Sequence, residues 1–217
     1  MKIKPPQIPE ALSKVTDFLG LMAAIKHKEY DISNVLLKDE FITDYDFAGQ
    51  GFRNMVFDNC RFINCSFYKG CFTDVKFKNC DFSGSDFELS YFSRCEFSSS
   101  KAVGTTFPQS NFINVVITDS IFEYANFDNG KLQQIKIADS CFNYANITSA
   151  NLKELDLSET QFLGTVFFKT PLKGINFTKC TIKNISISQD CKELKGMQVS
   201  LIQGAELSTF LGIEIVE

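Results

Sequence analysis

The sequence predicts a solenoid that winds with four sides and four five-residue repeats in each turn, and two repeats lead to this prediction. An apolar residue recurs at every fifth position from Ile32 to Ile187 without an insertion or a deletion. Of these 32 central positions, 31 hold Phe, Ile or Leu, and only Ala102 departs from the pattern. A period of five fits neither an α-helix nor a β-strand, so the repeat itself must define the architecture.

The second repeat concerns the residue two places before each centre. From Cys60 to Cys180 this residue is small or β-branched at 22 of 25 positions, and the exceptions Ile135, Leu155 and Ile175 recur at intervals of four pentads. Four pentads therefore make one turn, and each residue is expected to lie above the residue 20 places earlier. Each side then packs one large centre and one small residue inside the coil at the density of a protein core.

This pattern resembles the pentapeptide-repeat family, whose loose signature is A(D/N)Lxx. The matching segments are CDFSG (80–84), SDFEL (85–89), ANFDN (125–129), ANITS (145–149) and ANLKE (150–154). The resemblance covers about residues 30–190 and implies an all-β fold, a right-handed quadrilateral parallel β-helix of about eight coils. Three regions are therefore expected: an N-terminal capping helix segment (1–29), the β-helix (30–191) and a C-terminal dimerisation module (192–217).

Residues 5–28 precede the first coil and are expected to form an amphipathic helix that begins near Pro9. Its apolar face would carry Leu12, Val15, Leu19, Met22 and Ile25. Such a helix can cover the open core and strand edges of the first coil; the alternative is a helix that binds a membrane or a partner. His27, the only histidine, is interpreted as a polar residue at the end of this helix.

After Ile187 the pattern changes, and the tail predicts a helix followed by a short strand at 213–216. Ser200 is the expected N-cap and Gly212 the residue that stops the helix. The tail is similar to that of a narrower group, the Qnr, MfpA and AlbG type, at Val199, Ser200, Gln203, Leu211, Gly212, Ile213 and Ile215. That group dimerises through its C-terminal module. The resemblance therefore implies a homodimer, with a predicted interface at Leu163, Val166, Phe168, Leu201, Ile202, Ala205, Leu207, Phe210, Leu211, Ile213 and Ile215.

Charge is distributed unevenly along the chain. Residues 1–28 hold five Lys and two acids, whereas the rest of the chain holds 17 basic and 24 acidic side chains, a net charge of −7. Direct nucleic-acid binding is not expected, because it needs clustered Lys and Arg. The Qnr-type resemblance implies instead a DNA mimic that binds DNA gyrase or topoisomerase IV and protects the enzyme from quinolone-type inhibitors. The candidate partner-binding acids are Asp119, Glu123, Asp128, Asp139, Asp156 and Glu159.

Three of these acids, Asp119, Asp139 and Glu159, share one outward position in successive coils. They are expected to form a line with steps of roughly 4.8 Å, the spacing of stacked strands. Like charges so placed repel and cost stability, which favours a functional role. Lys136 and Lys179 interrupt the acidic field, and the alternative is a rigid scaffold or regulator of another protein whose acids only solvate its surface.

Catalysis, metal binding and membrane insertion are not expected. Five of the eight cysteines, Cys60, Cys65, Cys80, Cys95 and Cys180, occupy small inward positions and are predicted to be packed thiols. With one histidine, the common catalytic triads and zinc sites are excluded, so neither an enzyme nor a cofactor is predicted. The sequence has no apolar run long enough to span a bilayer and no signal core at its start, which predicts a cytoplasmic protein without a membrane partner.

Overall fold

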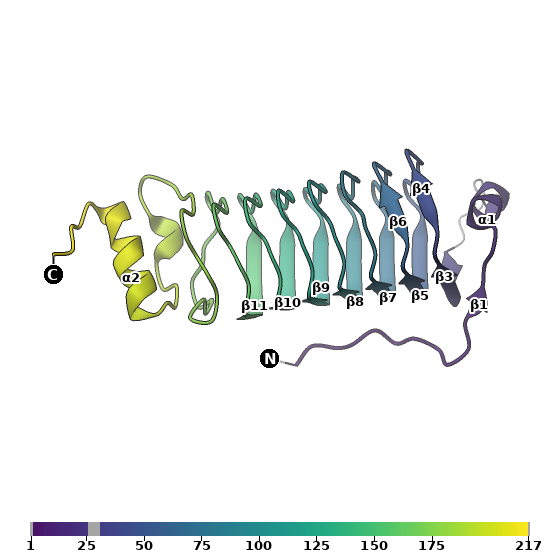
Figure 1. The fold of residues 1–217 in the computed structure, drawn as a ribbon, viewed down its shortest axis with the longest axis horizontal. Helices are drawn as coiled ribbons and strands as arrows, with labels where there is room; N and C mark the ends of the chain where they lie inside the picture. The colour runs from purple at the N-terminus through teal and green to yellow at the C-terminus, as the bar shows by residue number, and fades with distance from the viewer. Residues whose placement is uncertain (1, 26–30, 217) are drawn as a thin grey trace.

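The computed structural model describes residues 2–25 and 31–216, and His27 lies outside them. The chain forms the predicted right-handed quadrilateral β-helix, with about seven turns (Figure 1). The count of pentads gave about eight coils; beyond β11 the coil continues to Ser186 through isolated bridges and without a further strand. In chain order the elements are β1 (Ser13–Lys14), α1 (Phe18–Ile25), β2 (Ile32–Ser33), β3 (Val35–Lys38), β4 (Phe41–Thr43), β5 (Gly51–Asp58), β6 (Arg61–Ile63), β7 (Cys71–Lys78), β8 (Tyr91–Ser98), β9 (Asn111–Thr118), β10 (Lys131–Ala138), β11 (Asn151–Ser158), η1 (Lys192–Leu194), α2 (Leu201–Ser208) and η2 (Thr209–Leu211).

The predicted register of four pentads per turn is confirmed along the shaft. The strand pairings of the described residues are parallel, and the larger sheet runs in the order β1-β3-β5-β7-β8-β9-β10-β11. Coil residues pair with partners 20 places away, from Ile32 with Phe52 to Val166 with Ser186. None of the helices in the described part of the chain is long and apolar enough to cross a bilayer.

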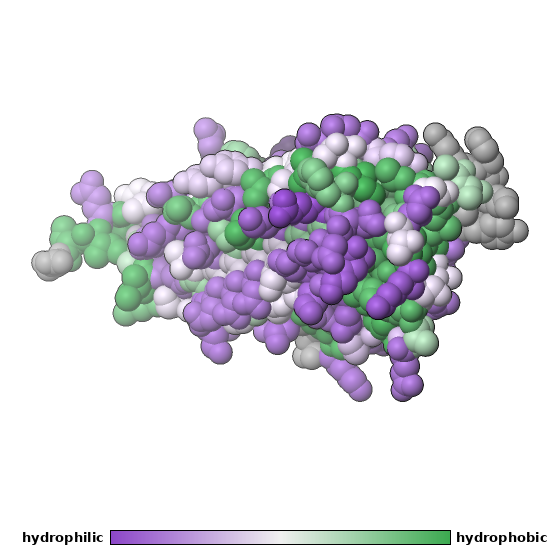
Figure 2. Space-filling model, turned by 45° about the vertical axis from the view of Figure 1, so that its right-hand side comes forward, coloured by the Kyte–Doolittle hydropathy of each residue, from purple (hydrophilic) through white to green (hydrophobic). Residues whose placement is uncertain are grey.

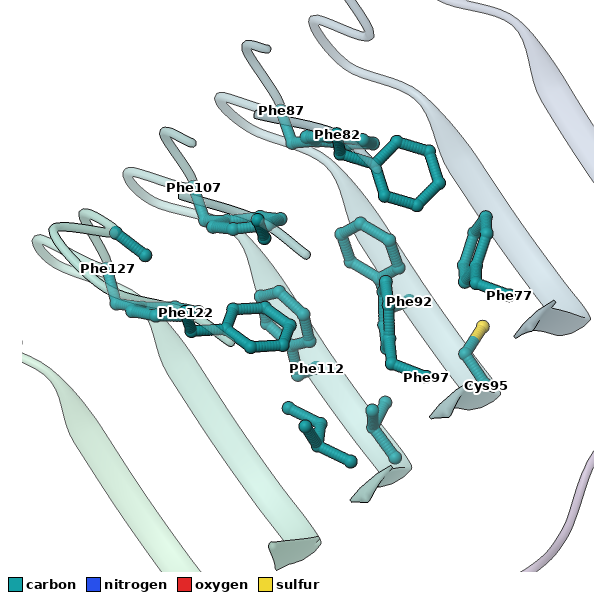
Figure 3. Packing of buried hydrophobic residues seen from close by; sticks show 14 of the residues in the cluster. Phe77, Phe82, Phe87, Phe92, Cys95, Phe97, Phe107, Phe112, Phe122 and Phe127 are labelled. Carbon is teal, nitrogen blue, oxygen red and sulfur yellow. The ribbon is translucent and has the colours of Figure 1, made fainter. Parts of the chain in front are cut away.

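Columns of phenylalanine rings fill the interior, as the five-residue period predicts. Phe92 stacks on Phe112 with ring centroids 4.5 Å apart, and Phe107 stacks on Phe127 at 5.0 Å (Figure 3). Where Ala102 interrupts its column, Phe97 packs edge-on against Phe122 at 5.8 Å. Such offset and edge contacts are favourable beyond the burial of area, so the core gains from neighbouring turns as well as from neighbouring sides.

Each turn has corner residues, two places after a centre, at which the backbone adopts a positive φ. In one turn these are Asp119, Tyr124, Asn129 and Gln134, with φ of 51°, 57°, 55° and 56°. Four such residues per turn divide the coil into four sides. Because the register is exactly four pentads, each corner continues as a column along the shaft, and the residue types in a column decide what that edge presents to solvent.

The N-terminal helix caps the first turn, but it is shorter than predicted. It begins at Phe18 rather than near Pro9, and the Asp17 carboxylate accepts the Gly20 N–H at 2.8 Å, as an N-cap does. Phe18 is buried against Phe47, with ring centroids 5.8 Å apart. The prediction of an apolar helix face is wrong at three positions. Leu12 and Val15 precede the helix, and Leu19 lies on the helix but is exposed.

Residues 2–14 form an N-terminal strap that runs lengthwise along the shaft (Figure 1). Ser13 pairs with Val35 in β3. Further along, the Gln7 N–H donates to Asp74 Oδ1 in β7 at 2.9 Å, and the Lys4 N–H donates to Asn114 Oδ1 in β9 at 3.0 Å. The strap thus crosses several turns, and these contacts, together with the prolines at positions 5, 6 and 9, explain why this segment is not helical.

The C-terminal helix α2 begins as predicted but ends at Ser208, where the chain passes into η2, and the short strand is not formed. Ser200 is the N-cap of α2 and forms a capping box with Gln203. Gly212, with a φ of 69°, is the C-cap of η2 and ends the helical segment. The buried Gln203 amide donates to the carbonyls of Phe177 and Cys180 at 3.0 and 2.7 Å, which ties α2 to the last coil. Residues 213–216 have no neighbouring strand to pair with among the described residues of this chain, so the prediction of a strand there is wrong for a single chain.

Candidate interaction face

The predicted acidic ladder, Asp119, Asp139 and Glu159, occupies one corner column. All three side chains are exposed and their residues have positive φ. The backbone places them one turn apart, since the Asp119 N–H donates to Ala138 O and the Asp139 N–H donates to Ser158 O, each at 3.2 Å. The structure therefore brings these three carboxylates into line along the shaft.

The ladder is bounded within its own column. The next corner residue after Glu159 is Lys179, whose carbonyl accepts the Glu159 N–H at 2.9 Å. In the opposite direction the next corner residue is Ser99, followed by the amides Asn79 and Asn59, of which Asn79 donates to Asn59 at 2.8 Å. The acidic stretch is thus three turns long and is bounded by Ser99 at one end and by Lys179 at the other.

The other three predicted acids lie on different sides of the coil. Glu123 is on the side between the Asp119 and Tyr124 corners, whereas Asp128 is on the following side, beyond Tyr124. Asp156 belongs to β11 on the side before the acidic ladder, in register with Lys136. The six acids therefore do not form one surface: the ladder is the edge between the side of Glu123 and the side of Asp156, and Asp128 lies on neither.

Sequence reasoning missed the corner column on the other edge of that side. Tyr124 and Tyr144 stack face to face, with ring centroids 5.2 Å apart and an interplanar angle of 11°. They are 59% and 48% exposed, so the stack stands in solvent. The signal was present in the sequence, because two tyrosines one turn apart at outward positions must meet once the period is known.

The acidic ladder and the tyrosine pair border one side of three turns, residues 119–124, 139–144 and 159–164, which we call the acid–tyrosine face. Its side chains are linked between turns: the Cys141 thiol donates to Glu123 Oε1 at 3.2 Å, and Asn143 donates to Gln161 Oε1 at 3.3 Å. Burial, together with the nearby Glu123 carboxylate, raises the pKa of the Cys141 thiol, so it remains a protonated donor. The face holds four acids and no Lys or Arg.

The predicted dimer residues fall into two groups. On the C-terminal module, Leu201 and Ile202 are 90% and 75% exposed, whereas Leu207 packs partly against the core. Hydrophobic colour gathers at the C-terminal end of the molecule in Figure 2. The second group, on the last coils, consists of Leu163, Val166 and Phe168. All eleven predicted residues are half-buried or exposed: Leu163, Val166, Phe168, Leu201, Ile202, Ala205, Leu207, Phe210, Leu211, Ile213 and Ile215.

The five inward cysteines are buried and free, as their positions predict. Cys60 and Cys80 are neighbours one turn apart, and each thiol also donates to a backbone carbonyl, Cys60 to Leu37 O and Cys80 to Phe57 O, both at 3.4 Å. Burial raises the pKa of Cys95 to about 12, which keeps its thiol protonated. Among the described residues no group of three His, Cys, Asp or Glu side chains is placed to hold a metal ion.

The chain is similar to solved structures of other proteins. Full-length QnrB1, described as a plasmid-mediated fluoroquinolone resistance protein, is 21% identical with a TM-score of 0.52, over 82% of this chain and 91% of that one. HetL, a pentapeptide repeat protein involved in heterocyst differentiation regulation from Nostoc sp. strain PCC 7120, is 12% identical with a TM-score of 0.38, over 87% and 95% of the two chains. No curated protein matches the sequence significantly.

Two family descriptions match the shaft itself. The pentapeptide repeat region matches residues 70–147, and pentapeptide repeats in eight copies match residues 142–184. Together they span 70–184, which is more than half of the 217 residues and includes all of the acid–tyrosine face. With the register of four pentads per turn and the columns of Phe, these matches show that the chain belongs to the pentapeptide-repeat family.

Proposed function

We propose that this protein binds DNA gyrase or topoisomerase IV as a DNA mimic and protects the enzyme from quinolone-type inhibitors. The observation that carries the proposal is the acidic ladder, three exposed carboxylates held one turn apart on a regular shaft. Their steps of about 4.8 Å are longer than the roughly 3.4 Å of helix axis per phosphate of one DNA strand. The ladder therefore imitates a short run of phosphates at lower charge density.

Rigidity supports this role. The ladder is fixed by backbone hydrogen bonds between turns and by the Phe columns beneath it. A preformed surface loses little conformational entropy when it binds, so a modest number of charges can suffice. Pentapeptide-repeat scaffolds are generally structural or binding proteins, and we infer a binding role without catalysis for this chain. The resistance described for QnrB1 belongs to that protein, and the likeness to it concerns the fold alone.

Homodimerisation is part of the proposal. Leu201, Ile202 and Ile215 expose large apolar side chains at one end of the shaft, and such a surface marks an interface. A second copy would cover this patch and could supply the neighbouring strand that residues 213–216 lack among the described part of the chain. Two shafts joined end to end would present a longer acidic surface than one.

A second candidate function is a rigid scaffold or regulator of a different protein. The exposed Tyr124 and Tyr144 favour it, since an aromatic stack is a feature of protein interfaces rather than of a phosphate backbone. The two candidates make different demands on the partner: a DNA mimic must compete with DNA for the topoisomerase, whereas a scaffold need not.

The test is a gyrase supercoiling assay with ciprofloxacin present and absent, titrated with this protein. The wild type is expected to restore supercoiling in ciprofloxacin, whereas the variant Asp119→Asn/Asp139→Asn/Glu159→Gln is expected to need a higher concentration. Binding should also weaken as salt rises, because salt screens the exposed carboxylates, which act mainly by increasing the rate of association. A matched control removes three exposed acids elsewhere: Glu10→Gln/Asp44→Asn/Glu154→Gln.

If the ladder variant and the control variant protect gyrase equally well, the three acids do not take part in binding and only solvate the surface. A wild-type protein with no effect on gyrase or topoisomerase IV would reject the topoisomerase proposal and leave the scaffold as the better candidate.

A further inference from the structure

The corner column that contains the tyrosine pair includes Gly84, Gly104, Tyr124, Tyr144 and Gly164. Tyr124 and Tyr144 both have φ of 57°, a conformation that bulky L-residues rarely adopt. Most other described corner residues with positive φ are small or polar. Corner residues along the whole shaft share this conformation, so it is the exposure and the stacking of two large rings, and not the backbone, that set this column apart.

Side chains in this column lean by one turn toward the C-terminal end. A Cβ added at Gly164 would lie 2.6 Å from the ring of Tyr144, and one added at Gly84 would lie 2.4 Å from Asn64 Oδ1. Each of these side chains therefore covers the corner of the next turn. By the same rule, a side chain at position 104 would lie against the face of Tyr124 that Tyr144 does not cover.

Gly104 has no side chain to fill that position. A Cβ built at Gly104 meets no atom within 4 Å, whereas the two glycines on either side of it in the column are covered. The stack therefore continues into an open position below Tyr124, because neither Gly84 nor Gly104 has a side chain to fill it. The two ring centroids above it are 5.2 Å apart, a step that a planar group can occupy by stacking.

The negative charge of the acid–tyrosine face favours a planar group that is a cation. The acid–tyrosine face carries Asp119, Glu123, Asp139 and Glu159 and no base. A cation is attracted by these carboxylates and by the face of an aromatic ring. A guanidinium is planar and weakly hydrated and stacks on aromatic rings, whereas an ammonium is compact and strongly hydrated. Lys101, exposed in the turn below, repels any cation equally and does not change this preference.

We propose that the open position between Gly104 and Tyr124 docks an arginine side chain of a partner protein. The guanidinium stacks on the free face of Tyr124, and its charge is balanced by the carboxylates of the acid–tyrosine face. This rests on the proposed function only for the identity of the partner, since DNA-binding surfaces are rich in Arg. It adds a preference for Arg over Lys that an acidic ladder alone does not provide.

The test uses blocked tetra-arginine and tetra-lysine peptides, with no topoisomerase present. The protein has six Tyr and no Trp, so its intrinsic emission reports on tyrosine. We expect tetra-arginine to bind about three- to fivefold more tightly than tetra-lysine, the size of one exposed cation–π contact. We also expect the arginine peptide to change the tyrosine emission more strongly at saturation.

Two variants remove the position in different ways. Gly104→Asn fills it with an amide and keeps the corner conformation, which asparagine adopts at Asn34 and Asn54. Tyr124→Asn removes the ring. Both should bind the two peptides equally, with circular dichroism and melting temperature showing that the fold is kept. The controls, Gln109→Asn at the next corner and Tyr91→Phe outside the column, should keep the arginine preference.

Equal affinity of the wild type for the two peptides, or an unchanged preference in Gly104→Asn, would overturn the proposal. Removal of the ladder charges should instead weaken both peptides by the same factor. If the arginine preference holds and gyrase is unaffected, the docking position stands and the proposed topoisomerase role fails. Loss of the preference with intact gyrase protection would reject the docking position alone.

Discussion

Individual corner residues determine what each edge of the shaft presents. Asn and Asp tolerate positive φ because their short side chains bond locally, and they occupy many corners of the first turns. Tyr124 and Tyr144 adopt the same conformation at a cost of order 1 kcal/mol each. Stacking between them contributes about 0.5–1.5 kcal/mol, so their mutual contact offsets part of this cost.

Two glycines in this column provide a matched pair of substitutions. Gly104→Ala should cost about 1 kcal/mol, because a Cβ at its φ of 63° is strained but meets no atom. Gly164→Ala has a φ of 64° and should cost about 2 kcal/mol, since its Cβ also displaces the Tyr144 ring from the stack. Urea unfolding measures both, and near-ultraviolet circular dichroism should change only for Gly164→Ala. Equal costs would show that the Tyr144 ring moves aside freely.

Among the elements, the N-terminal strap depends on one buried ion pair. The Asp74 carboxylate accepts hydrogen bonds from Arg94 Nε and Nη2, at 2.6 Å each. It also accepts a hydrogen bond from the Gln7 N–H of the strap. Burial raises the pKa of Asp74, but the hydrogen bonds from Arg94 and Gln7 outweigh it, and the pKa lies below its usual range. The carboxylate thus stays charged and holds the strap and β8 at one point.

This ion pair predicts how the strap responds to acid. Because the folded pKa of Asp74 is below the unfolded value of about 3.9, its contribution is complete above that pH and is lost as pH falls through the folded value. The strap should therefore stay docked from pH 7 to 5 and loosen at lower pH. Exchange of the Gln7 and Lys4 amides, corrected for intrinsic rates, measures this. Amides that exchange equally at pH 5 and below pH 3 would contradict it.

Removal of the charge should have the same effect at neutral pH. Asp74→Asn is expected to destabilise the protein by about 2 kcal/mol and to increase exchange in the strap, because it breaks a charged hydrogen-bond pair. The control is Glu96→Gln, which removes a more exposed pair with Lys76 at 3.4 Å and should cost less than about 1 kcal/mol. A strap that remains protected in Asp74→Asn would show that its apolar contacts suffice.

For the whole molecule, the C-terminal module combines two roles that can be separated. Gln203 anchors α2 to the last coil, while Leu201 and Ile202 point away from it and are exposed. The variant Leu201→Glu/Ile202→Glu should therefore abolish the proposed dimer while each protomer keeps its fold, as far-ultraviolet circular dichroism would show; its melting temperature should no longer depend on protein concentration. Sedimentation velocity measures the change, with the wild type expected as a dimer at micromolar concentration.

The control for this experiment lies at the other end of the shaft. Phe41→Glu replaces an apolar side chain that is 67% exposed in β4 and should leave the dimer intact. A monomeric wild type, or a dimer that survives both charges on α2, would contradict the C-terminal interface.

The sequence alone determined the shaft, because its period is also the period of its contacts. A residue that recurs every five places and a register of four pentads specify the neighbours of each residue, so the inward Phe and Cys and the line of Asp119, Asp139 and Glu159 could be predicted. The same arithmetic places Tyr144 above Tyr124, a contact that the sequence analysis missed although the period contains it. Ser200 and Gly212 were also predictable, since helix caps depend on local hydrogen bonds.

Only the tertiary structure decided the parts outside the period. The strap contacts join residues 67 and 110 places apart, Gln7 with Asp74 and Lys4 with Asn114, and no repeat specifies them. They displaced the start of α1 from Pro9 to Phe18. The open position at Gly104 likewise depends on the direction in which Tyr144 and its column lean. That direction is set by side-chain packing in three dimensions, which a periodic pattern does not contain.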